Sequence, residues 1–351
     1  MKPPDHSTPS GDRTIARLTF VALRLAGAEP HLASRLVLRD GAGDPERQAA
    51  LIDAATQEAE RLIAAYRPAP PDAWLTYHSY YKAPDLLGPR VTGALGLPYA
   101  ISEPSVSPRR RIGPWAAFAE ASDRALAAAD RLFWTTERDR PALEAAGHGA
   151  RLHPLPAFIE VRPAGAMGRP AQTPARLLTV AMMRPGDKAE SYRRLAAALP
   201  HLHTDWRLQI VGDGPEADAI RALFAPVADR VMWLGAIDQP EALRALYAGA
   251  DALVWPGVGE GVGLVWLEAQ AAAVPVVAED GPAARSLVAG RRVAPAGDPI
   301  SFARAIERAL ADRPDLSRLA WEHVSASHSL KAAARTLGRW LDAVPVQGRI
   351  Q

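Results

Sequence analysis

The sequence predicts an α/β protein of two Rossmann-like domains, each with a parallel sheet, that face a central cleft. Short apolar runs alternate with amphipathic helical segments almost from end to end, a pattern typical of strands that alternate with helices. The length of 351 residues is typical of about two domains. Residues 158–174 interrupt the alternation with an aperiodic stretch rich in proline and glycine, which we interpret as the linker.

Residues 1–157 form the first predicted domain. Strands are expected at residues 30–34, 73–77, 98–102, 132–135 and 150–155. Helical patterns lie at residues 14–26, 45–66, 84–95, 114–129 and 137–146. This alternation implies a parallel sheet that is covered on both faces.

Residues 175–312 form the second predicted domain, where the alternation restarts. Strands are expected at residues 176–183, 206–211, 231–234, 252–255, 275–278 and 292–294. Helical patterns lie at residues 188–199, 216–224, 240–248, 264–273, 283–288 and 300–311.

The tail, residues 313–351, has a helical pattern whose apolar stripe could pack on either domain. The stripe consists of Leu330, Ala334, Leu337 and Leu341.

Composition excludes several classes of protein. The chain has no cysteine and therefore no disulfide framework or thiolate metal site. The nine histidines never pair at a metal-ligand spacing on one helix, and His201 and His203 flank Leu202 in a loop-like stretch, so no metal is expected. Without a signal peptide or a run of ~18 apolar residues, the protein is expected in the cytoplasm or at the inner face of the membrane.

Charge gives a weaker indication. A formal net charge of +2 is too small to predict nucleic-acid binding. The local cluster Arg109-Arg110-Arg111 could meet a phosphate or make a peripheral contact with an anionic membrane surface. A solvated loop is the alternative that we favour for this cluster.

The most informative stretch runs from Glu260 to Glu268. These two carboxylates lie eight residues apart, at either end of a glycine-bearing turn that leads into an apolar helix. Glycines let the backbone approach a ligand, and the free N–H groups of a first helical turn favour negative charge. The stretch also follows the strand-like run 252–255, and in open α/β sheets ligands collect at the carboxyl ends of strands. The alternative is a helix capped by one acid while the other is solvated.

The second domain resembles a known family through motifs that occur in a fixed order. They are residues 210–216 (IVGDGPE), 231–235 (VMWLG), 246–252 (LYAGADA), 256–268 (PGVGEGVGLVWLE), 274–278 (VPVVA) and 293–299 (VAPAGDP). Over about residues 172–312 this set resembles the donor domain of retaining nucleotide-sugar glycosyltransferases of family four (glycosyl transferases group 1), which have the GT-B fold. The resemblance implies transfer of a sugar from a nucleoside-diphosphate sugar to an acceptor, with the anomeric configuration retained and without a metal or other cofactor.

The resemblance points to glycan or glycolipid biosynthesis. It does not define the acceptor, which could be a glycan, a lipid or a small molecule. The resemblance does imply which residues bind the donor. Glu268 would accept hydrogen bonds from the ribose hydroxyls, since a carboxylate can bridge a diol. Glu260 would face the donor sugar. The other residues expected at the donor are Gly212, Asp213, Gly214, Gly235, Gly261, Val262, Gly263 and Leu264.

The cations for the leaving diphosphate are expected after the first strand of the second domain, where Arg184 and Lys188 are the candidates. The family usually has Gly-Arg where this chain has Ala181-Met182, so Arg184 stands two residues late. Either Arg184 reaches the diphosphate from a shifted turn or Lys188 works largely alone, and Arg184 could also be an exposed turn arginine. A second departure is residues 279–286, whose donor contacts cannot be carried over.

The first domain offers acceptor-side candidates. Ser10 and Gly11 stand where the family has a glycine-rich loop, and Lys82 and Glu103 follow predicted strands. His78 could transfer a proton at neutral pH, although a structural hydrogen-bonding role is the alternative. Family chains place a buried strand before the glycine-rich loop, which leads us to expect a start site read too late or a natural truncation, and a first domain of low stability.

Two other functions stay open on the sequence alone. A nucleotide-sugar epimerase can share the two-domain fold, but it needs acid and base residues around the sugar ring, for which only His78 and Glu103 are available. A degenerate, non-catalytic nucleotide-sugar-binding protein is suggested by Ala181-Met182 and by the missing first strand.

Overall fold

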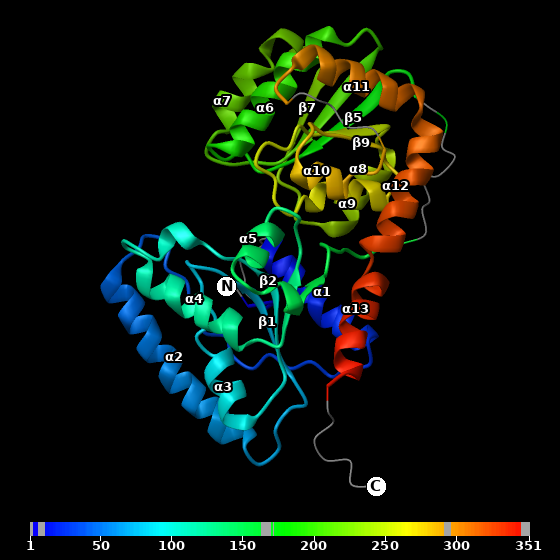
Figure 1. The fold of residues 1–351 in the computed structure, drawn as a ribbon. Helices are drawn as coiled ribbons and strands as arrows, with labels where there is room; N and C mark the ends of the chain where they lie inside the picture. Colours follow the sequence, from blue (N-terminus) through cyan, green and yellow to red (C-terminus); the bar gives the residue numbers. More distant parts are fainter. Residues whose placement is uncertain (1–2, 6–10, 163–169, 171, 291–295, 345–351) are drawn as a thin grey trace. The chain divides into compact units, whose positions relative to one another are not determined.

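The computed structural model describes residues 3–5, 11–162, 170, 172–290 and 296–344. The chain divides into two units, Met1–Ala157 with Leu330–Gln351 (unit 1) and Phe158–Ser329 (unit 2). Each unit contains its own parallel sheet with helices packed around it (Figure 1). The prediction of two α/β domains built on parallel sheets is therefore confirmed. The strand predicted at residues 292–294 falls outside the described residues.

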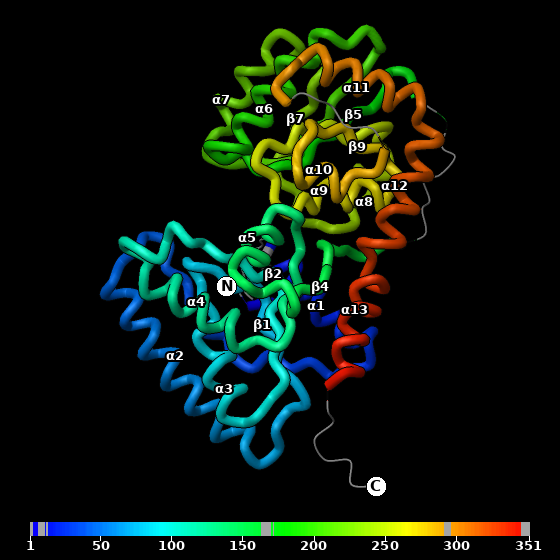
Figure 2. Tube along the Cα trace, in the orientation of Figure 1, coloured from blue at the N-terminus to red at the C-terminus, as the bar shows by residue number. Residues whose placement is uncertain are grey.

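Unit 1 contains a four-stranded parallel sheet in the order β1-β2-β3-β4. The strands are β1 (Trp74–Ser79), β2 (Tyr99–Pro104), β3 (Arg131–Trp134) and β4 (Leu152–Pro154). The helices are α1 (Gly11–Leu25), α2 (Pro45–Tyr66), α3 (Gly88–Leu95), α4 (Ala116–Ala128), α5 (Arg140–Ala145) and α13 (Leu330–Asp342), with the 3₁₀ turns η1 (Pro108–Arg110) and η2 (Gly149–Arg151). The core packs Tyr99 and Ile101 of β2 against Leu126 of α4 and Leu132 of β3. Helices α1 and α13, from distant parts of the sequence, lie side by side (Figure 2).

The prediction of a strand at residues 30–34 is wrong, because this segment has no sheet partner. Pro30 lacks the N–H group that a ladder requires. A few residues later the N–H of Leu36 is satisfied locally by the Ser34 hydroxyl, at 3.1 Å. The segment has no regular secondary structure up to Asp40, whose N–H donates to the carbonyl of Lys82 at 2.9 Å.

Helix α3 begins at Gly88, four residues later than the pattern predicts, because Asp85 caps it. One carboxylate oxygen of Asp85 accepts from the N–H groups of Leu87 and Gly88, at 3.0 and 2.8 Å. The other accepts from the hydroxyls of Thr76 and Tyr99, each at 2.5 Å. The buried carboxylate thus satisfies helix N–H groups that would otherwise lack partners.

Unit 2 contains a five-stranded parallel sheet in the order β7-β6-β5-β8-β9. The strands are β5 (Ala175–Val180), β6 (Trp206–Val211), β7 (Val231–Gly235), β8 (Ala252–Val254) and β9 (Val276–Val277). The helices are α6 (Asp187–Ala198), α7 (Ala217–Leu223), α8 (Pro240–Gly249), α9 (Leu264–Ala271), α10 (Pro282–Leu287), α11 (Pro299–Ala311) and α12 (Arg313–Ser327), with the 3₁₀ turns η3 (Leu199–His201) and η4 (Ala225–Arg230). Helix α11 packs near α6, and α12 packs along α9.

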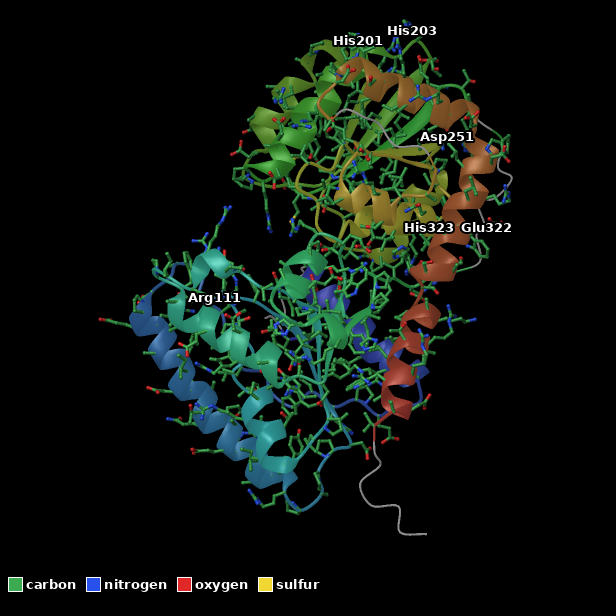
Figure 3. The ribbon with its side chains drawn as sticks, in the orientation of Figure 1. Arg111, His201, His203, Asp251, Glu322 and His323 are labelled. Carbon is green, nitrogen blue, oxygen red and sulfur yellow. The ribbon has the colours of Figure 1, made fainter. Side chains whose placement is uncertain are left out.

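The start of α12 is anchored to the sheet by buried charge. Arg313 Nε lies 3.4 Å from Asp251 Oδ1, and both residues are at most 5% exposed. Asp251 is labelled in Figure 3. The second oxygen of Asp251 accepts from the N–H of Arg176 at 2.9 Å, beside the start of β5. Within the described residues, no helix combines the length and the apolar character that a bilayer crossing requires.

Candidate functional site

The strand order of unit 2 creates a switch point between β5 and β8. Strand β5 pairs with β6 on one side and with β8 on the other. Strands β6 and β7 are thus added on one side of β5, and β8 and β9 on the other side, so the order in which strands are added reverses between β5 and β8. Ligands of open parallel sheets bind outside the carboxyl ends of the strands at such a point. The loops that leave these two strands, residues 181–186 and 255–263, contain or adjoin most of the residues that the sequence predicts for donor binding.

Glycines 212 and 214 allow the loops after β5 and β6 to touch. The N–H of Met183 donates to the carbonyl of Asp213 at 2.9 Å. A Cβ atom on Gly212 would overlap the carbonyl oxygen of Ala181, and one on Gly214 would overlap that of Met183. Their φ angles of +147° and +156° also favour glycine. The Gly-Asp-Gly motif therefore holds two loops together at the edge of the switch point.

Gly235 ends β7 at the same edge of the sheet, with a φ of +67°. Its carbonyl accepts a hydrogen bond from the N–H of Gly212 at 2.8 Å. The exposed Asp213 side chain accepts from the N–H of Gly214 at 2.7 Å. These residues shape the edge of the site through their backbone.

Lys188 and Glu260 form an ion pair at the centre of the switch point. Lys188 Nζ lies 2.6 Å from Glu260 Oε2. Lys188 lies on α6 and Glu260 in the loop after β8, and the two residues are 72 positions apart in sequence. The indole N–H of Trp255 donates to the same oxygen at 3.3 Å, and the ammonium lies 5.3 Å from the centre of the indole ring. Lys188 is thus held by a carboxylate and by the face of an aromatic ring, which stabilises a partly buried cation.

Trp255 is fully buried and rests on Tyr192 of α6, with ring centres 5.0 Å apart at 72°. The Tyr192 hydroxyl donates to the carbonyl of Ala181 at 2.7 Å. These contacts connect the loop after β5, helix α6 and the end of β8. The aromatic pair therefore fixes the positions from which Lys188 and Glu260 extend.

The first turn of α9 presents unused backbone donors. Gly263 precedes the helix in the left-handed conformation, with φ 58° and ψ 38°. In the described parts of the chain, the N–H groups of Gly261, Val262, Gly263 and Leu264 have no acceptor. Such groups, together with the helix dipole, are suited to phosphate or hydroxyl oxygens.

Glu268 lies one turn further along α9, and its carboxylate accepts from the hydroxyl of the fully buried Tyr247 at 2.7 Å. Burial raises the pKa of Glu268 above its ordinary value, whereas the hydrogen bond from Tyr247 and the charge of Arg244 act to lower it. Burial also raises the pKa of Tyr247 well above its ordinary range, so this hydroxyl remains a donor. One oxygen of Glu268 is thereby oriented, and the carboxylate keeps further acceptor capacity.

The structure does not bring Arg184 to the ion pair. Arg184 is exposed, and no acidic partner for its guanidinium lies within the described residues. Met182 is also exposed, at 45%, on the same loop. The loop therefore presents one unpaired cation and one apolar side chain to solvent.

The segment 279–286, which includes most of α10, contributes a buried carboxylate and no direct site residue. Glu279 is 6% exposed and forms an ion pair with Arg194 of α6 at 2.5 Å. Its other oxygen accepts from the N–H of Gly297 at 2.9 Å, and its own N–H donates to the carbonyl of Pro256. Glu279 thus ties this loop to the segment that follows β8.

In unit 1 the structure brings His78 and Glu103 together at the carboxyl ends of β1 and β2. His78 Nδ1 lies 3.4 Å from Glu103 Oε2, and both side chains are less than 20% exposed. Both residues have positive φ angles, 61° and 56°. Such a backbone conformation costs about 1–3 kcal/mol in a residue other than glycine and is concentrated at functional sites. Lys82 follows β1, Gly11 opens α1, and Ser10 lies outside the described residues.

Two residues of the site were not among the sequence candidates. In the sequence, Trp255 is part of an apolar strand-like run, and Tyr247 is part of a helical motif. One signal could have identified Trp255. Its indole donor stands directly before a turn that carries a glutamate, and buried Trp side chains usually find an acceptor.

A family model described as "Glycosyl transferases group 1" matches residues 174–312, the segment that contains the switch point. The resemblance to that family is confirmed. The matched segment covers the sheet of unit 2 and the helices from α6 to α11.

Curated relatives match part of this chain. An exopolysaccharide phosphotransferase of Streptomyces coelicolor is 35% identical over 196 residues, which are 53% of this chain and 20% of the relative. A D-inositol 3-phosphate glycosyltransferase of Paenarthrobacter aurescens is 36% identical over 126 residues, 34% of this chain and 31% of the relative. The chain thus spans less than a third of the length of these curated relatives.

Solved structures establish the fold. The Anabaena protein HepE, solved in complex with UDP, aligns with a TM-score of 0.67 at 15% sequence identity, over 96% of this chain and 98% of that chain. Since the identity is low, the similarity is one of fold, and this fold is the GT-B class of glycosyltransferases.

Proposed function

We propose that the chain is a glycosyltransferase that transfers a sugar from a nucleoside-diphosphate sugar to an acceptor with retention of the anomeric configuration. One observation carries the proposal, namely that the Lys188–Glu260 ion pair and the Glu268 carboxylate flank the unused N–H groups of α9 at the switch point. A single anionic, hydroxyl-rich ligand can use all three. The match to glycosyl transferases group 1 and the complex of HepE with UDP support a nucleotide-sugar donor.

In this proposal the donor replaces the internal ion pair. A diphosphate oxygen takes the place of Glu260 at the ammonium of Lys188, and Glu260 turns to the hydroxyls of the donor sugar. As the bond to the diphosphate breaks, negative charge grows on the leaving oxygen, and a cation already in place stabilises it without reorganisation. Glu268 accepts from the ribose hydroxyls while Tyr247 keeps the carboxylate oriented.

We propose that protein cations, and not a metal ion, neutralise the diphosphate. Lys188 supplies the first charge, and the exposed guanidinium of Arg184 is free to supply the second. Turnover should then persist in the presence of a chelator such as EDTA. In unit 1, we assign proton transfer from the acceptor hydroxyl to His78, whose Nδ1 faces Glu103.

A non-catalytic nucleotide-sugar-binding protein is the second candidate, because Met182 is exposed on the loop where the diphosphate is expected and Arg184 lies away from the ion pair. The two candidates share the binding site. They differ only in whether the bound donor is broken down.

The test is a panel of nucleotide-sugars with different bases and sugars, incubated with the full chain and followed by mass spectrometry and proton NMR. Slow donor hydrolysis or transfer supports the proposed function, and the coupling constant of the anomeric proton in the product tests retention. Binding without turnover would support the non-catalytic protein, and isomerisation of the sugar would identify an epimerase. Lys188→Met should abolish most turnover, whereas the matched control Lys331→Met, an exposed lysine on α13, should not.

A further inference from the structure

Unit 1 carries a continuous row of aromatic rings at the carboxyl ends of β1 and β2. The ring centres of His78 and Tyr80 lie 4.7 Å apart, those of Tyr80 and Tyr81 5.6 Å, and those of Tyr81 and Trp115 5.6 Å. All four residues are half-buried, so the row is anchored in unit 1 and still accessible. Aromatic faces of this kind pack against the C–H faces of sugar or polyol rings.

Two cations lie at one end of the row. Lys82 Nζ is 5.7 Å from the Tyr81 ring centre and 5.4 Å from that of Trp115. The guanidinium carbon of Arg110 is 5.2 and 4.9 Å from the same two rings. Within the described residues neither cation has a carboxylate partner, whereas the neighbouring Arg111 is paired with Asp123 at 2.7 Å. Two unpaired cations held on the same rings favour an anion between them.

Buried hydrogen bonds hold the frame of this cationic end. Gln48 Nε2 donates to the carboxylate of Asp40 and to the carbonyl of Pro114, both at 2.8 Å, and the N–H of Asp40 donates to the carbonyl of Lys82 at 2.9 Å. Asp40 and Gln48 are at most 2% exposed. Burial acts to raise the pKa of Asp40, but hydrogen bonds from Gln48 and from backbone N–H groups outweigh it and keep the pKa below its ordinary value. A buried amide and carboxylate thus fix the two loops that carry Lys82 and Trp115.

The other end of the row is the His78–Glu103 pair, which is fixed by its strained backbone. The row therefore connects an acid–base pair to a site for negative charge across a surface that suits a ring. This order matches the parts of one ligand, a hydroxyl, a ring and an anionic group. Lysine provides a compact charge and arginine a planar fork, a combination that suits phosphate oxygens.

We propose that unit 1 binds an acceptor that carries a phosphate group, with the phosphate at Lys82 and Arg110, the ring of a sugar or polyol along Tyr80 and Tyr81, and the reacting hydroxyl at His78. The assignment of an acceptor rests on the proposed function, whereas the phosphate site itself does not. A soluble sugar phosphate and the head group of a phospholipid share this chemistry, and the experiment separates them.

The first arm is calorimetric titration of the full chain with glucose 6-phosphate and with glucose, in low salt and with saturating UDP to block anion binding in unit 2. Glucose 6-phosphate should bind at least tenfold more tightly than glucose. Lys82→Met and Arg110→Gln should each reduce the affinity for glucose 6-phosphate about fivefold or more, because each removes one charge. Arg61→Gln, an exposed arginine on α2 in the same unit, is the matched control and should change nothing.

The second arm is sedimentation with vesicles of phosphatidylinositol and phosphatidylcholine (30:70), compared with phosphatidylcholine alone. Loss of anionic-vesicle binding in Lys82→Met and Arg110→Gln, but not in Arg109→Gln, would assign the site to a lipid head group. Binding of glucose 6-phosphate alone would assign it to a soluble phosphate ester. The proposal is overturned if neither ligand depends on Lys82 and Arg110, or if glucose binds as well as its phosphate. Failure of the proposed function would appear separately, as phosphate binding without any donor turnover.

Discussion

At the scale of single residues, Glu268 is held where its charge is penalised. A carboxyl whose pKa is raised by folding adds most to stability below its unfolded pKa of about 4.5, and this contribution is lost as the pH rises through the raised pKa. Glu268→Gln cannot ionise and can keep the hydrogen bond from Tyr247. We therefore expect the variant to gain about 1 kcal/mol of unfolding free energy over the wild type between pH 4 and pH 8. Urea unfolding at several pH values measures this difference.

The same variant should bind nucleotide poorly. An amide cannot replace a carboxylate that accepts from two ribose hydroxyls, and hydrogen bonds to charged groups are each worth about 1.5–3 kcal/mol. The affinity for the preferred nucleoside diphosphate should fall tenfold or more, as measured by calorimetry. Glu322→Gln, an exposed carboxyl on α12, is the control (Figure 3). Equal affinities in Glu268→Gln and the wild type would remove Glu268 from the donor site.

Substitutions of Lys188 and Trp255 are expected to lower turnover to different extents. Lys188→Met should lower kcat about 10²- to 10³-fold with a smaller change in KM, because the ammonium acts mainly on charge that develops in the transition state. Trp255→Phe keeps a ring beneath the ammonium and loses only the indole donor to Glu260, so kcat should fall about two- to tenfold. Steady-state kinetics with thermal unfolding as a check on folding tests both. A loss in Trp255→Phe as large as in Lys188→Met would mean that the ring itself is misplaced.

Sequence could predict which charged residues lie at the candidate site, but not the groups that orient them. Glu260, Lys188 and Glu268 stand in motifs with fixed spacing, so their proximity followed from the strand order. Trp255 and Tyr247 look like ordinary core residues in the sequence, because their polar atoms find partners only through tertiary contacts. The side chain of Arg184 could not be placed from sequence, since its loop follows the departure at Ala181-Met182.

At the scale of elements, boundaries were predictable where capping and periodicity agree. Helix α2 and strand β6 have the bounds that the sequence predicts, and α2 begins after Asp44, whose side chain accepts from two N–H groups of the first turn. The error at residues 30–34 arose because an apolar run does not reveal whether a partner strand exists. The late start of α3 depends on the carboxylate of Asp85, which also binds Thr76 and Tyr99 from other elements.

The contact between the loops after β5 and β6 should make the stability of unit 2 sensitive to a side chain at Gly212. Gly212→Ala would place a methyl group against the backbone of Ala181, which cannot move like a side chain, so unit 2 should lose about 2–4 kcal/mol of unfolding free energy. Gly235→Ala has a positive φ but open space around its Cβ, and should lose only about 1–2 kcal/mol. Gly149→Ala has neither constraint and is the control. Denaturant unfolding ranks the three, and equal losses at positions 212 and 235 would contradict the steric argument.

At the scale of the whole molecule, the chain divides the parts of the proposed reaction between two sheets. The switch point, with Lys188, Glu260 and Glu268, lies entirely in unit 2. The pair of His78 and Glu103 and the aromatic row lie entirely in unit 1. In the proposal, each unit therefore binds its ligand through contacts that it alone supplies.

Hydrogen exchange of the full chain tests this division. A nucleoside diphosphate at about 100 times its Kd stabilises its binding segments by about 2.7 kcal/mol, which can slow local exchange up to about 100-fold. With UDP, the largest protection is expected at residues 181–188 and 257–268 of unit 2; with glucose 6-phosphate, it is expected at residues 76–84 and 108–116 of unit 1. Helix α13, which packs on α1 in unit 1, reports on non-specific effects. If UDP protected residues 76–84 more than residues 257–268, the donor would bind to unit 1, and the roles assigned to Lys188, Glu260 and Glu268 would all be wrong.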